Sequence, residues 1–547
     1  MKKNEIVVGV CEDYTNEGLG VAKVDGFPLF VKGLLRGERA RLLVMKVKKG
    51  YGFAKIVELL EESGERQKPF CKIYQWCGGC QLQHMSLKEQ AYFKQQKVAH
   101  ALRRIGNCEA KVEPILAMDS PYGYRNKGQI PVGVDAYGEV VCGFYRMNSH
   151  DIIDMEVCPI QSDLINTCVA VMKEGLRRFG CAAYFRHLLV KHAFANDTVM
   201  LVWIVRERVF SQMQELCDWV VGKLPMVKSI VLNVNQRKDN VILGEEEFLL
   251  YGEQMIYDML GGIEFGISAK SFYQVNPVQT KVLYEQALAF AQLSGSEEVL
   301  DLYCGVGTIS LFLAQHAKHV TGIEIVGDAI RNAKENARRN GIDHVDFICS
   351  DAAQYAAVLA ERGKKVDVVV VDPPRKGCDE LTLASILQME PKRIVYVSCD
   401  PATLARDVRY LEERGYECVR VQPVDMFGWS YHVETVVLLS HKSPDSVINV
   451  KVEFGESDDK ISLDAIAERA KKYHPKPKIT YKMIQEYVEK KYGFKVHTAY
   501  IAEVKRSLGL TMYDASNAVE ELNQPRKHPP KEKVEAIKDA LKYFEVI

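Results

Sequence analysis

The 547-residue sequence lacks the features of membrane and secreted proteins. No apolar run reaches the 18 or so residues that a membrane span needs, and the longest runs, such as Val366–Val371, have the length of a strand. The start, Met1–Glu5, lacks the apolar stretch of a signal peptide. Net charge is also absent, because 72 lysines and arginines balance 72 acidic residues. We therefore expect a cytoplasmic protein without a membrane partner, in which any basic surface is local.

Fifteen cysteines are present in a chain that has no other sign of secretion, which argues against a disulfide framework. Reduced thiols, a metal site or catalysis are the roles that this leaves. Hydrophobic residues make up 47% of the chain and charged residues 26%, as in ordinary soluble globular proteins. At about 150 residues per domain, the length predicts three to four domains.

The first 60 residues form a region of their own. Short β-type runs alternate with glycine-containing turns, and eleven basic residues stand against seven acidic ones. This pattern predicts a small five-stranded barrel, which can lay nucleic acid across its strands or act only as a spacer. Residues 61–265 begin with a polar linker, include a helix-like stretch over 87–105, and continue as an α+β region.

At residue 266 the pattern changes to apolar strands that alternate with helices, and it extends to residue 441. We predict strands at residues 298–303, 320–325, 345–348, 366–371, 393–399, 418–423 and 432–439. Near-continuous apolar strands separated by helices, such as the one over 327–340, are typical of a doubly wound, mostly parallel sheet.

Residues 442–547 differ again, with a polar linker followed by a basic tail. Helices are predicted over 479–492 and 499–508. From residue 471 onward, 16 basic residues stand against 10 acidic ones, so the tail has a local surplus of positive charge.

A glycine-rich turn follows the first strand of the alternating region. Gly305 and Gly307 would let the backbone approach a cofactor, and the next helix presents its N-terminus to polar groups. Glu324 closes the second strand, where a carboxylate can accept hydrogen bonds from both hydroxyls of a ribose. This arrangement fits NAD or S-adenosylmethionine, but Ser310 replaces the third glycine of a dinucleotide fingerprint, which disfavours NAD. An ordinary tight turn is the alternative.

Three reactive side chains lie at the same predicted edge of the sheet. Two prolines after Asp372 fix the backbone, so that its carboxylate projects where the fourth strand ends. Cys399 ends the fifth strand and is a candidate nucleophile, with an inert buried thiol as the alternative. Glu434 lies in an apolar strand, where desolvation would raise its pKa and suit it to act as a general base. Arg406 is a candidate for activating the thiol.

A second group of cysteines has the spacing of metal ligands. Cys71, Cys77 and Cys80 lie close together, and Cys158 precedes a proline, a pair that often flanks iron–sulfur ligands. Four thiolates can hold a tetrahedral zinc ion or a [4Fe-4S] cluster. A redox pair of Cys77 and Cys80 is the alternative, and it would leave the other two cysteines without a role.

Four motifs together resemble the RNA uracil-C5 methyltransferases, most closely the members of this family that act on 23S ribosomal RNA. They are the segments Asp301–Thr308, Asp372–Arg375, Ser398–Asp407 and His432–Thr435. The resemblance runs from the first strands to about Leu439.

The resemblance implies S-adenosyl-L-methionine as methyl donor and a covalent mechanism. Cys399 would add to C6 of uracil, and Glu434 would remove the C5 proton after methyl transfer. The cofactor contacts that it implies are Gln274, Tyr303, Glu324 and Asp372. Asp351, which closes the third strand, could reach the adenine. The iron–sulfur ligands that it implies, for a [4Fe-4S] cluster with a role in folding or RNA binding, are Cys71, Cys77, Cys80 and Cys158.

The predicted architecture has a Rossmann-like doubly wound methyltransferase domain at 266–441, an OB-like TRAM β-barrel at 1–60, a central α+β iron–sulfur domain at 61–265 and a helical tail. In the family, a helical segment at about 86–118 packs on the catalytic domain. We expect a monomer that methylates 23S ribosomal RNA to 5-methyluridine without an obligate protein partner, with Arg125 and Lys127 as candidate RNA contacts.

Three alternatives stay open from the sequence. The same chemistry on transfer RNA would use the same catalytic motifs, although that type typically lacks the barrel and the cysteine group. A non-catalytic RNA-binding protein on this fold would be expected to lack Cys399 or Glu434, and both are present. A radical S-adenosylmethionine enzyme needs C-x3-C-x2-C, whereas five residues separate Cys71 from Cys77 here.

Overall fold

The computed structural model describes residues 1–442, 481–508 and 528–544. The chain divides into two compact units, 1–447 and 448–547, which are treated separately here. Within the described part of the chain, no helix is both long and apolar enough to cross a membrane.

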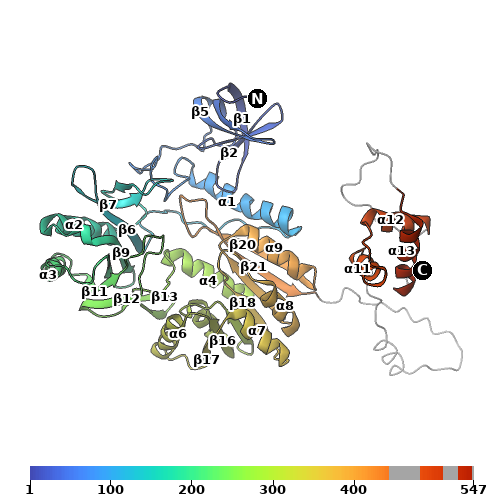
Figure 1. Cartoon of the computed structure of the whole chain (residues 1–547). Coiled ribbons are helices and arrows are strands. Elements are labelled where there is room, and N and C mark those ends of the chain that lie inside the picture. The colour runs from blue at the N-terminus through green and yellow to red at the C-terminus, as the bar shows by residue number, and fades with distance from the viewer. Residues whose placement is uncertain (443–480, 509–527, 545–547) are drawn as a thin grey trace. The chain divides into compact units, whose positions relative to one another are not determined.

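The N-terminal strands close into a barrel (Figure 1). Its strands are β1 (Ile6–Tyr14), β2 (Gly20–Val24), β3 (Phe27–Val31), β4 (Arg39–Val47) and β5 (Gly52–Glu61). They follow the order β1-β2-β3-β5-β4, and β1 pairs with β4 to complete the ring. Alternate side chains of β4, Ala40, Leu42 and Val44, point into the core, as expected of a half-buried strand. The predicted five-stranded barrel is confirmed.

The central region is built on a seven-stranded sheet with the order β12-β11-β10-β9-β6-β7-β8. The strands are β6 (Lys127–Val134), β7 (Val140–Tyr145), β8 (Ile152–Asp154), β9 (Phe185–Ala193), β10 (Thr198–Val205), β11 (Val227–Val234) and β12 (Glu246–Gly252). Helices α2 (Asp163–Phe179) and α3 (Met213–Lys223) share a core with one face of this sheet. The other face packs on the hairpin of β13 (Ile256–Leu260) and β14 (Ile263–Ile267), so it continues into the core of the next region.

The third region carries the strand–helix alternation. Its strands are β15 (Glu298–Leu302), β16 (His319–Glu324), β17 (Val345–Cys349), β18 (Val368–Val371), β19 (Arg393–Ser398), β20 (Tyr416–Val424) and β21 (Glu434–His441). The order is β17-β16-β15-β18-β19-β21-β20, with β21 antiparallel to both neighbours and the other pairs parallel. The predicted doubly wound, mostly parallel sheet is confirmed.

Helices cover both faces of this sheet. They are α4 (Pro277–Ala291), α5 (Thr308–Ala314), α6 (Gly327–Arg339), α7 (Ala352–Glu361), α8 (Glu380–Met389) and α9 (Pro401–Glu412). The valines of β18 alternate between the two cores, with Val368 and Val370 on the α4–α6 side and Val369 and Val371 on the α7–α9 side. The strand order reverses between β15 and β18, and a ligand crevice forms beyond the carboxyl ends of strands at such a point.

The segment after the barrel packs against the third region. Helix α1 (Leu87–Ala101) continues as a π-helical turn over Leu102–Gly106, which contacts α9. Beyond it, the backbone N–H groups of Glu113 and Leu116 donate to the carbonyls of Val421 and Pro423 at 2.9 and 3.0 Å. These bonds cover the otherwise open edge strand β20.

The C-terminal unit contains three described helices, α11 (Tyr481–Tyr492), α12 (Thr498–Ser507) and α13 (Lys531–Tyr543). They share an apolar core that includes Ile484, Ile501 and Ile537. Two of these helices lie where the sequence predicts them, and α13 is an addition. The predicted polar linker lies almost wholly in 443–480, outside the described residues.

Candidate active site

A cavity of about 450 Å³ lies at the carboxyl edge of the doubly wound sheet. Its volume is within the usual range for a small-ligand pocket. All six residues predicted to contact the cofactor line this cavity: Gln274, Tyr303, Gly305, Glu324, Asp351 and Asp372. Residues far apart in sequence therefore converge on one place, although the identity of the ligand has to be argued from their chemistry.

The two glycines of the loop after β15 serve different purposes. Gly305 has φ +57°, and a Cβ built there would meet no atom within 4 Å, so its surroundings leave space for a ligand. Gly307 has φ +81°, and a Cβ there would lie 2.6 Å from the ring of Phe347. Both glycines adopt a left-handed backbone conformation, but Gly307 is also required by packing, whereas Gly305 faces open space.

The loop and the acidic residue of β16 hold each other in place. The carboxylate of Glu324 accepts hydrogen bonds from the backbone N–H groups of Gly305, at 3.2 Å, and Val326, at 2.9 Å. Each carboxylate oxygen keeps a second lone pair, so both can still accept a hydroxyl of a ribose. Asp351 caps helix α7 by accepting the N–H of Gln354 at 3.0 Å, which fixes its place at the cavity wall.

The cavity has a surplus of acid groups. Among the described lining residues, the carboxylates of Glu324, Asp351, Asp372 and Asp379 stand against one cation, Lys376. Burial raises the pKa of Asp372 to about 7. A positively charged ligand would stabilise these carboxylates, whereas the pyrophosphate of a dinucleotide would be repelled. The charge therefore favours a sulfonium cofactor over NAD.

A buried lysine of the central sheet holds the loop between β14 and α4, which carries Gln274. Lys191 is 5% exposed and donates to the carbonyls of Ser268 and Ser271 at 2.6 and 2.8 Å. Asn126 donates its side-chain amide to the carbonyl of Gln274 at 3.0 Å. Sequence reasoning missed Lys191, although a lysine in the apolar strand β9 is an available signal. The central region thus holds the segment that carries Gln274.

Strand pairing brings the candidate nucleophile and base together. In the antiparallel ladder of β19 and β21, Ser398 pairs with Thr435. Cys399 follows the first and Glu434 precedes the second, so they occupy the next facing positions at the end of the ladder. Asp400 then caps α9 by accepting the N–H groups of Ala402 and Thr403. A thiol and a carboxylate separated in sequence therefore share one end of two adjacent strands.

The charges around these two groups are coupled. Burial raises the pKa of Cys399 to about 11, with Glu434 and Asp372 adding to the rise and Arg375 opposing it. Burial and Asp372 raise the pKa of Glu434 to about 8, again against Arg375. The thiol is therefore protonated at neutral pH before a substrate arrives, and Arg375 is the cation that acts on both groups.

Arg406, the cation suggested by the sequence, is occupied elsewhere. It forms an ion pair with Asp407 at 2.7 Å and donates to the carbonyls of Lys376 and Cys378 at 3.0 Å. These bonds brace the loop after β18 that carries Arg375. Proximity in sequence pointed to Arg406, whereas the turn after Asp372 places Arg375 at the site.

The four predicted ligand cysteines line a second cavity, of about 280 Å³. No three histidine, cysteine, aspartate or glutamate side chains in the described residues are arranged to hold a single metal ion. A [4Fe-4S] cluster bonds one iron to each of four thiolates, which surround it, whereas zinc requires them to converge on one point. The four thiols that line the cavity match the ligand type and number of such a cluster. The candidate RNA contact Arg125 lines this cavity as well.

Comparison with known proteins adds independent information. Residues 245–442 match the family described as tRNA (uracil-5-)-methyltransferase, and residues 8–57 match the TRAM domain. An uncharacterized RNA methyltransferase of Halalkalibacterium halodurans is 49% identical over 452 residues, which cover 81% of this chain and 98% of that protein. One of Clostridium tetani is 46% identical over 449 residues, covering 81% and 97%.

Among solved structures, the chain is similar to the Pyrococcus abyssi tRNA (uracil-54, C5)-methyltransferase in complex with S-adenosyl-L-homocysteine. The two share 25% sequence identity with a TM-score of 0.62, over 79% of this chain and 100% of the other.

Proposed function

Because the chain belongs to the tRNA (uracil-5-)-methyltransferase family and carries a TRAM domain, we propose that it methylates C5 of a specific uridine in 23S ribosomal RNA, with S-adenosylmethionine as donor. The observation that carries the proposal is the facing placement of Cys399 and Glu434 beside an acidic cavity. A thiol nucleophile paired with a desolvated carboxylate suits addition to a ring followed by removal of a proton.

The residues have distinct roles in this reaction. When bound, S-adenosylmethionine supplies an electrophilic methyl group on a positively charged sulfur. The Cys399 thiolate adds to C6 of uracil, and the electrons of the C5–C6 double bond move to give an enolate. C5 of that enolate takes the methyl group, and the neutral thioether S-adenosylhomocysteine is left as the second product. Glu434 then removes the C5 proton, the double bond re-forms, and the C6–S bond breaks to release Cys399 as thiolate.

Formation of the thiolate requires a change in local charge. The raised pKa of Cys399 comes from burial and from two nearby carboxyl groups, with Arg375 as the opposing cation. A sulfonium beside Asp372 would offset part of the negative charge and thus lower the pKa of the thiol. Bound cofactor would therefore make Cys399 more reactive toward uracil.

The barrel and the cysteine group support the choice of ribosomal RNA. Both belong to the resemblance with the type that acts on 23S RNA, and the barrel would bind the RNA backbone in a salt-dependent manner. The target base must leave its stack to reach Cys399. Transfer RNA is the second candidate substrate, favoured by the likeness to the archaeal transfer RNA enzyme.

The second cavity is proposed to hold a [4Fe-4S] cluster bound by Cys71, Cys77, Cys80 and Cys158. Methyl transfer from a sulfonium neither consumes nor produces electrons. The cluster would therefore serve the structure of the protein rather than supply electrons to the reaction.

The test is nucleotide-resolved mass spectrometry of unmodified 23S and transfer RNA incubated with the protein and S-adenosylmethionine. We expect 5-methyluridine at a defined 23S position, and none with the Cys399→Ala variant. Methylation of transfer RNA alone would select the second candidate, and no 5-methyluridine in either RNA would reject the proposed activity.

A further inference from the structure

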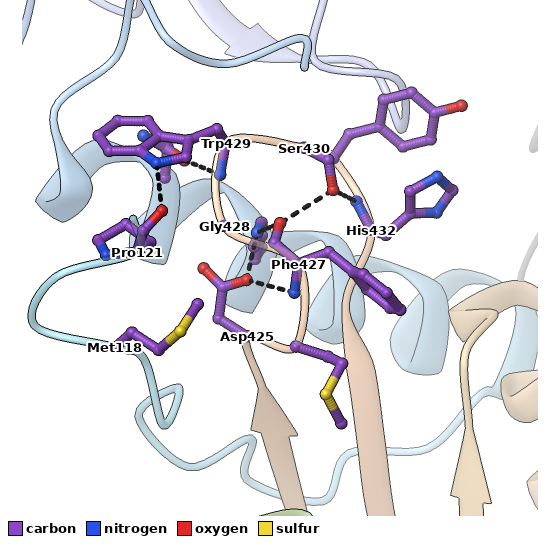
Figure 2. A network of polar contacts seen from close by, with 12 residues as sticks. Met118, Pro121, Asp425, Phe427, Gly428, Trp429, Ser430 and His432 are labelled. Carbon is purple, nitrogen blue, oxygen red and sulfur yellow. Dashed lines mark hydrogen bonds and ion pairs between the residues drawn. The ribbon is translucent and has the colours of Figure 1, made fainter. Parts of the chain in front are cut away.

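The loop over residues 425–433, here called the β20–β21 loop, leads directly to the proposed base. It connects two neighbouring antiparallel strands, and Val424 at its start pairs with Glu434 at its end. Figure 2 shows that its backbone and side chains take part in a dense network of polar contacts.

A buried cation holds the start of the loop. Lys94 of α1 is fully buried and forms an ion pair with Asp425 at 2.5 Å. The same ammonium group donates to the carbonyl of Phe427 at 3.0 Å. From the catalytic domain, Asn276 donates to the carbonyl of Met426 at 2.9 Å. The first residues of the loop are thus held from two domains.

Trp429 anchors the middle of the loop. It is 2% exposed and has φ +68°, a conformation that a bulky residue adopts only where its surroundings enforce it. Its indole N–H donates to the carbonyl of Pro121 at 2.9 Å, as Figure 2 shows. Its backbone N–H donates to the side chain of Gln90 at 3.1 Å, and Tyr124 donates to the neighbouring carbonyl of Gly428 at 3.1 Å.

The remaining contacts of Trp429 lead to the cysteine-bearing segment, residues 70–82. The carbonyl of Trp429 accepts the N–H groups of both Gln81 and Leu82 at 2.9 Å, directly after Cys80. Phe70, which precedes Cys71, packs edge-on against the indole at 4.9 Å between ring centroids. The segment that carries three of the four cysteines therefore contacts Trp429 at both ends. Its start packs on the indole ring, and its end bonds to the backbone carbonyl.

We propose that Trp429 is a positioning residue that transmits the order of the cysteine-bearing segment to Glu434. A group bound by the cysteines fixes residues 70–82, these residues fix Trp429, and Trp429 fixes the loop from which Glu434 emerges. The inference rests on the proposed function, because it assigns the proton-removal step to Glu434. It gives the cysteine site a part in the reaction that requires no electron transfer.

The two halves of the reaction allow the proposal to be tested. Addition of Cys399 and methyl transfer do not use Glu434, whereas proton removal does. RNA with 5-fluorouridine at the target has no C5 proton, so it stops as a covalent adduct whose rate of formation reports the first half alone. Uridine RNA reports both halves.

The Trp429→Phe variant removes the indole N–H but keeps an aromatic ring against Phe70. We expect adduct formation with 5-fluorouridine RNA within twofold of the wild-type rate. Formation of 5-methyluridine should slow by about ten- to a hundredfold, the scale of a misplacement near 1 Å, and a protein–RNA adduct should accumulate on uridine RNA. Tyr124→Phe, which removes only the bond to Gly428, should change the same rates in the same direction but less.

Trp203→Phe is the matched control. Trp203 is also buried, and it lies in the core of the central sheet. Its replacement should lower stability without accumulation of adduct. If Trp429→Phe slows both halves equally, or changes neither, the positioning role is rejected.

The link to the cysteines is tested with Cys77→Ser. Hydrogen exchange of the amides in 425–433 should become faster in this variant, and adduct should accumulate on uridine RNA as in Trp429→Phe. The double variant should be no worse than the more affected single variant, because both changes act on one path. Unchanged exchange in 425–433 would reject the link, whereas a wild-type protein that forms no adduct with 5-fluorouridine RNA would instead reject the proposed function.

Discussion

The cofactor cavity and the cysteine cavity are built in different ways. The cofactor cavity is framed by residues at ends of regular elements, such as Glu324 at the end of β16 and Asp351 at the start of α7. The four cysteines all lie outside the named helices and strands. A sheet edge places its side chains without help from a ligand, whereas loops need packing or a bound group to hold them. Damage to one cavity should therefore look different from damage to the other.

The largest effect is expected at the sheet edge. Cys399→Ala should reduce methyl transfer by more than about a thousandfold, because no other group can form the bond to C6. Binding of S-adenosylmethionine, measured by calorimetry, should stay within twofold, since Cys399 is not among the residues that line the cofactor cavity. A large loss of cofactor affinity would show that the sheet edge does not hold the cofactor cavity in place independently of Cys399.

Glu434→Gln should have the next largest effect. Loss of a general base lowers the rate by about 10²- to 10⁴-fold, and the covalent adduct should accumulate on uridine RNA because its proton is retained. Denaturing gels of protein mixed with labelled RNA measure the adduct. Release of product without adduct would assign proton removal to another group.

The pH dependence of the reaction rate is a second test of Glu434 as the base. Burial and Asp372 raise the pKa of Glu434 to about 8, so the single-turnover rate should rise as pH increases through this value and the base loses its proton. Glu434→Gln should lose the part of the rise that is centred near pH 8, whereas a rise that comes from ionisation of Cys399, whose pKa lies at about 11, should remain. A wild-type rate that is flat between pH 6.5 and about 9 would contradict the assignment of Glu434 as base.

Stability should show the opposite trend with pH. The folded pKa of Glu434 lies above its ordinary value of 4.5, so its protonation stabilises the fold below pH 4.5 and this contribution is lost as pH rises through about 8. Glu434→Gln should therefore be more stable than wild type at pH 9, by an amount on the order of 1 kcal/mol or more, and equally stable near pH 4. Thermal unfolding at the two pH values measures the difference.

Substitutions in the cysteine cavity should lower the stability of the fold and leave cofactor affinity nearly unchanged. Cys77→Ser should lower the free energy of unfolding by about 2 kcal/mol or more, because a bound group or a buried contact is lost from a loop. Affinity for S-adenosylmethionine should stay within twofold of wild type. Denaturant titration and calorimetry measure the two, and a parallel loss of both would mean that the cavities are not independent.

The smallest effect is expected from the C-terminal unit. Truncation to residues 1–445 removes the basic tail, with its 16 basic and 10 acidic residues after 470, and leaves both cavities. RNA affinity should fall by about threefold to tenfold at low salt, with a smaller loss at high salt. Filter binding at two salt concentrations measures this, and unchanged affinity would remove RNA contact from the roles of the tail.

The sequence predicted the catalytic sheet well because each of its strands is a local apolar run. Predicted and observed limits of β15, β16 and β19 agree within one residue. The central sheet was not resolved from the sequence, because its order depends on pairings such as that of β6 with β9, which are distant along the chain. The loop before β21 proved longer than predicted, since contacts of Trp429 rather than local pattern determine where the strand starts.

The candidate site follows the same division. Strand ends are visible in sequence, so the residues at the sheet edge could be identified. Cations that act through tertiary contacts could not be identified from the sequence. Arg375, rather than Arg406, acts on the thiol, and Lys191 and Lys94 hold loops of other domains. A lysine in an apolar strand or helix is a local sign of such a role, but its partner is not encoded nearby.

The pairing of Ser398 with Thr435 predicts where the chain tolerates a change in length: in the turn after α9, but not within β21. Insertions in the turn after α9 lengthen the route from Cys399 to Glu434 but leave the ladder as it is. Deletion of a single residue within β21 would shift the alternation of its side chains and turn every following one to the opposite face. A library of single-residue insertions and deletions through 393–441 should therefore yield active clones in the turn after α9, and none within β19, β21 or the β20–β21 loop.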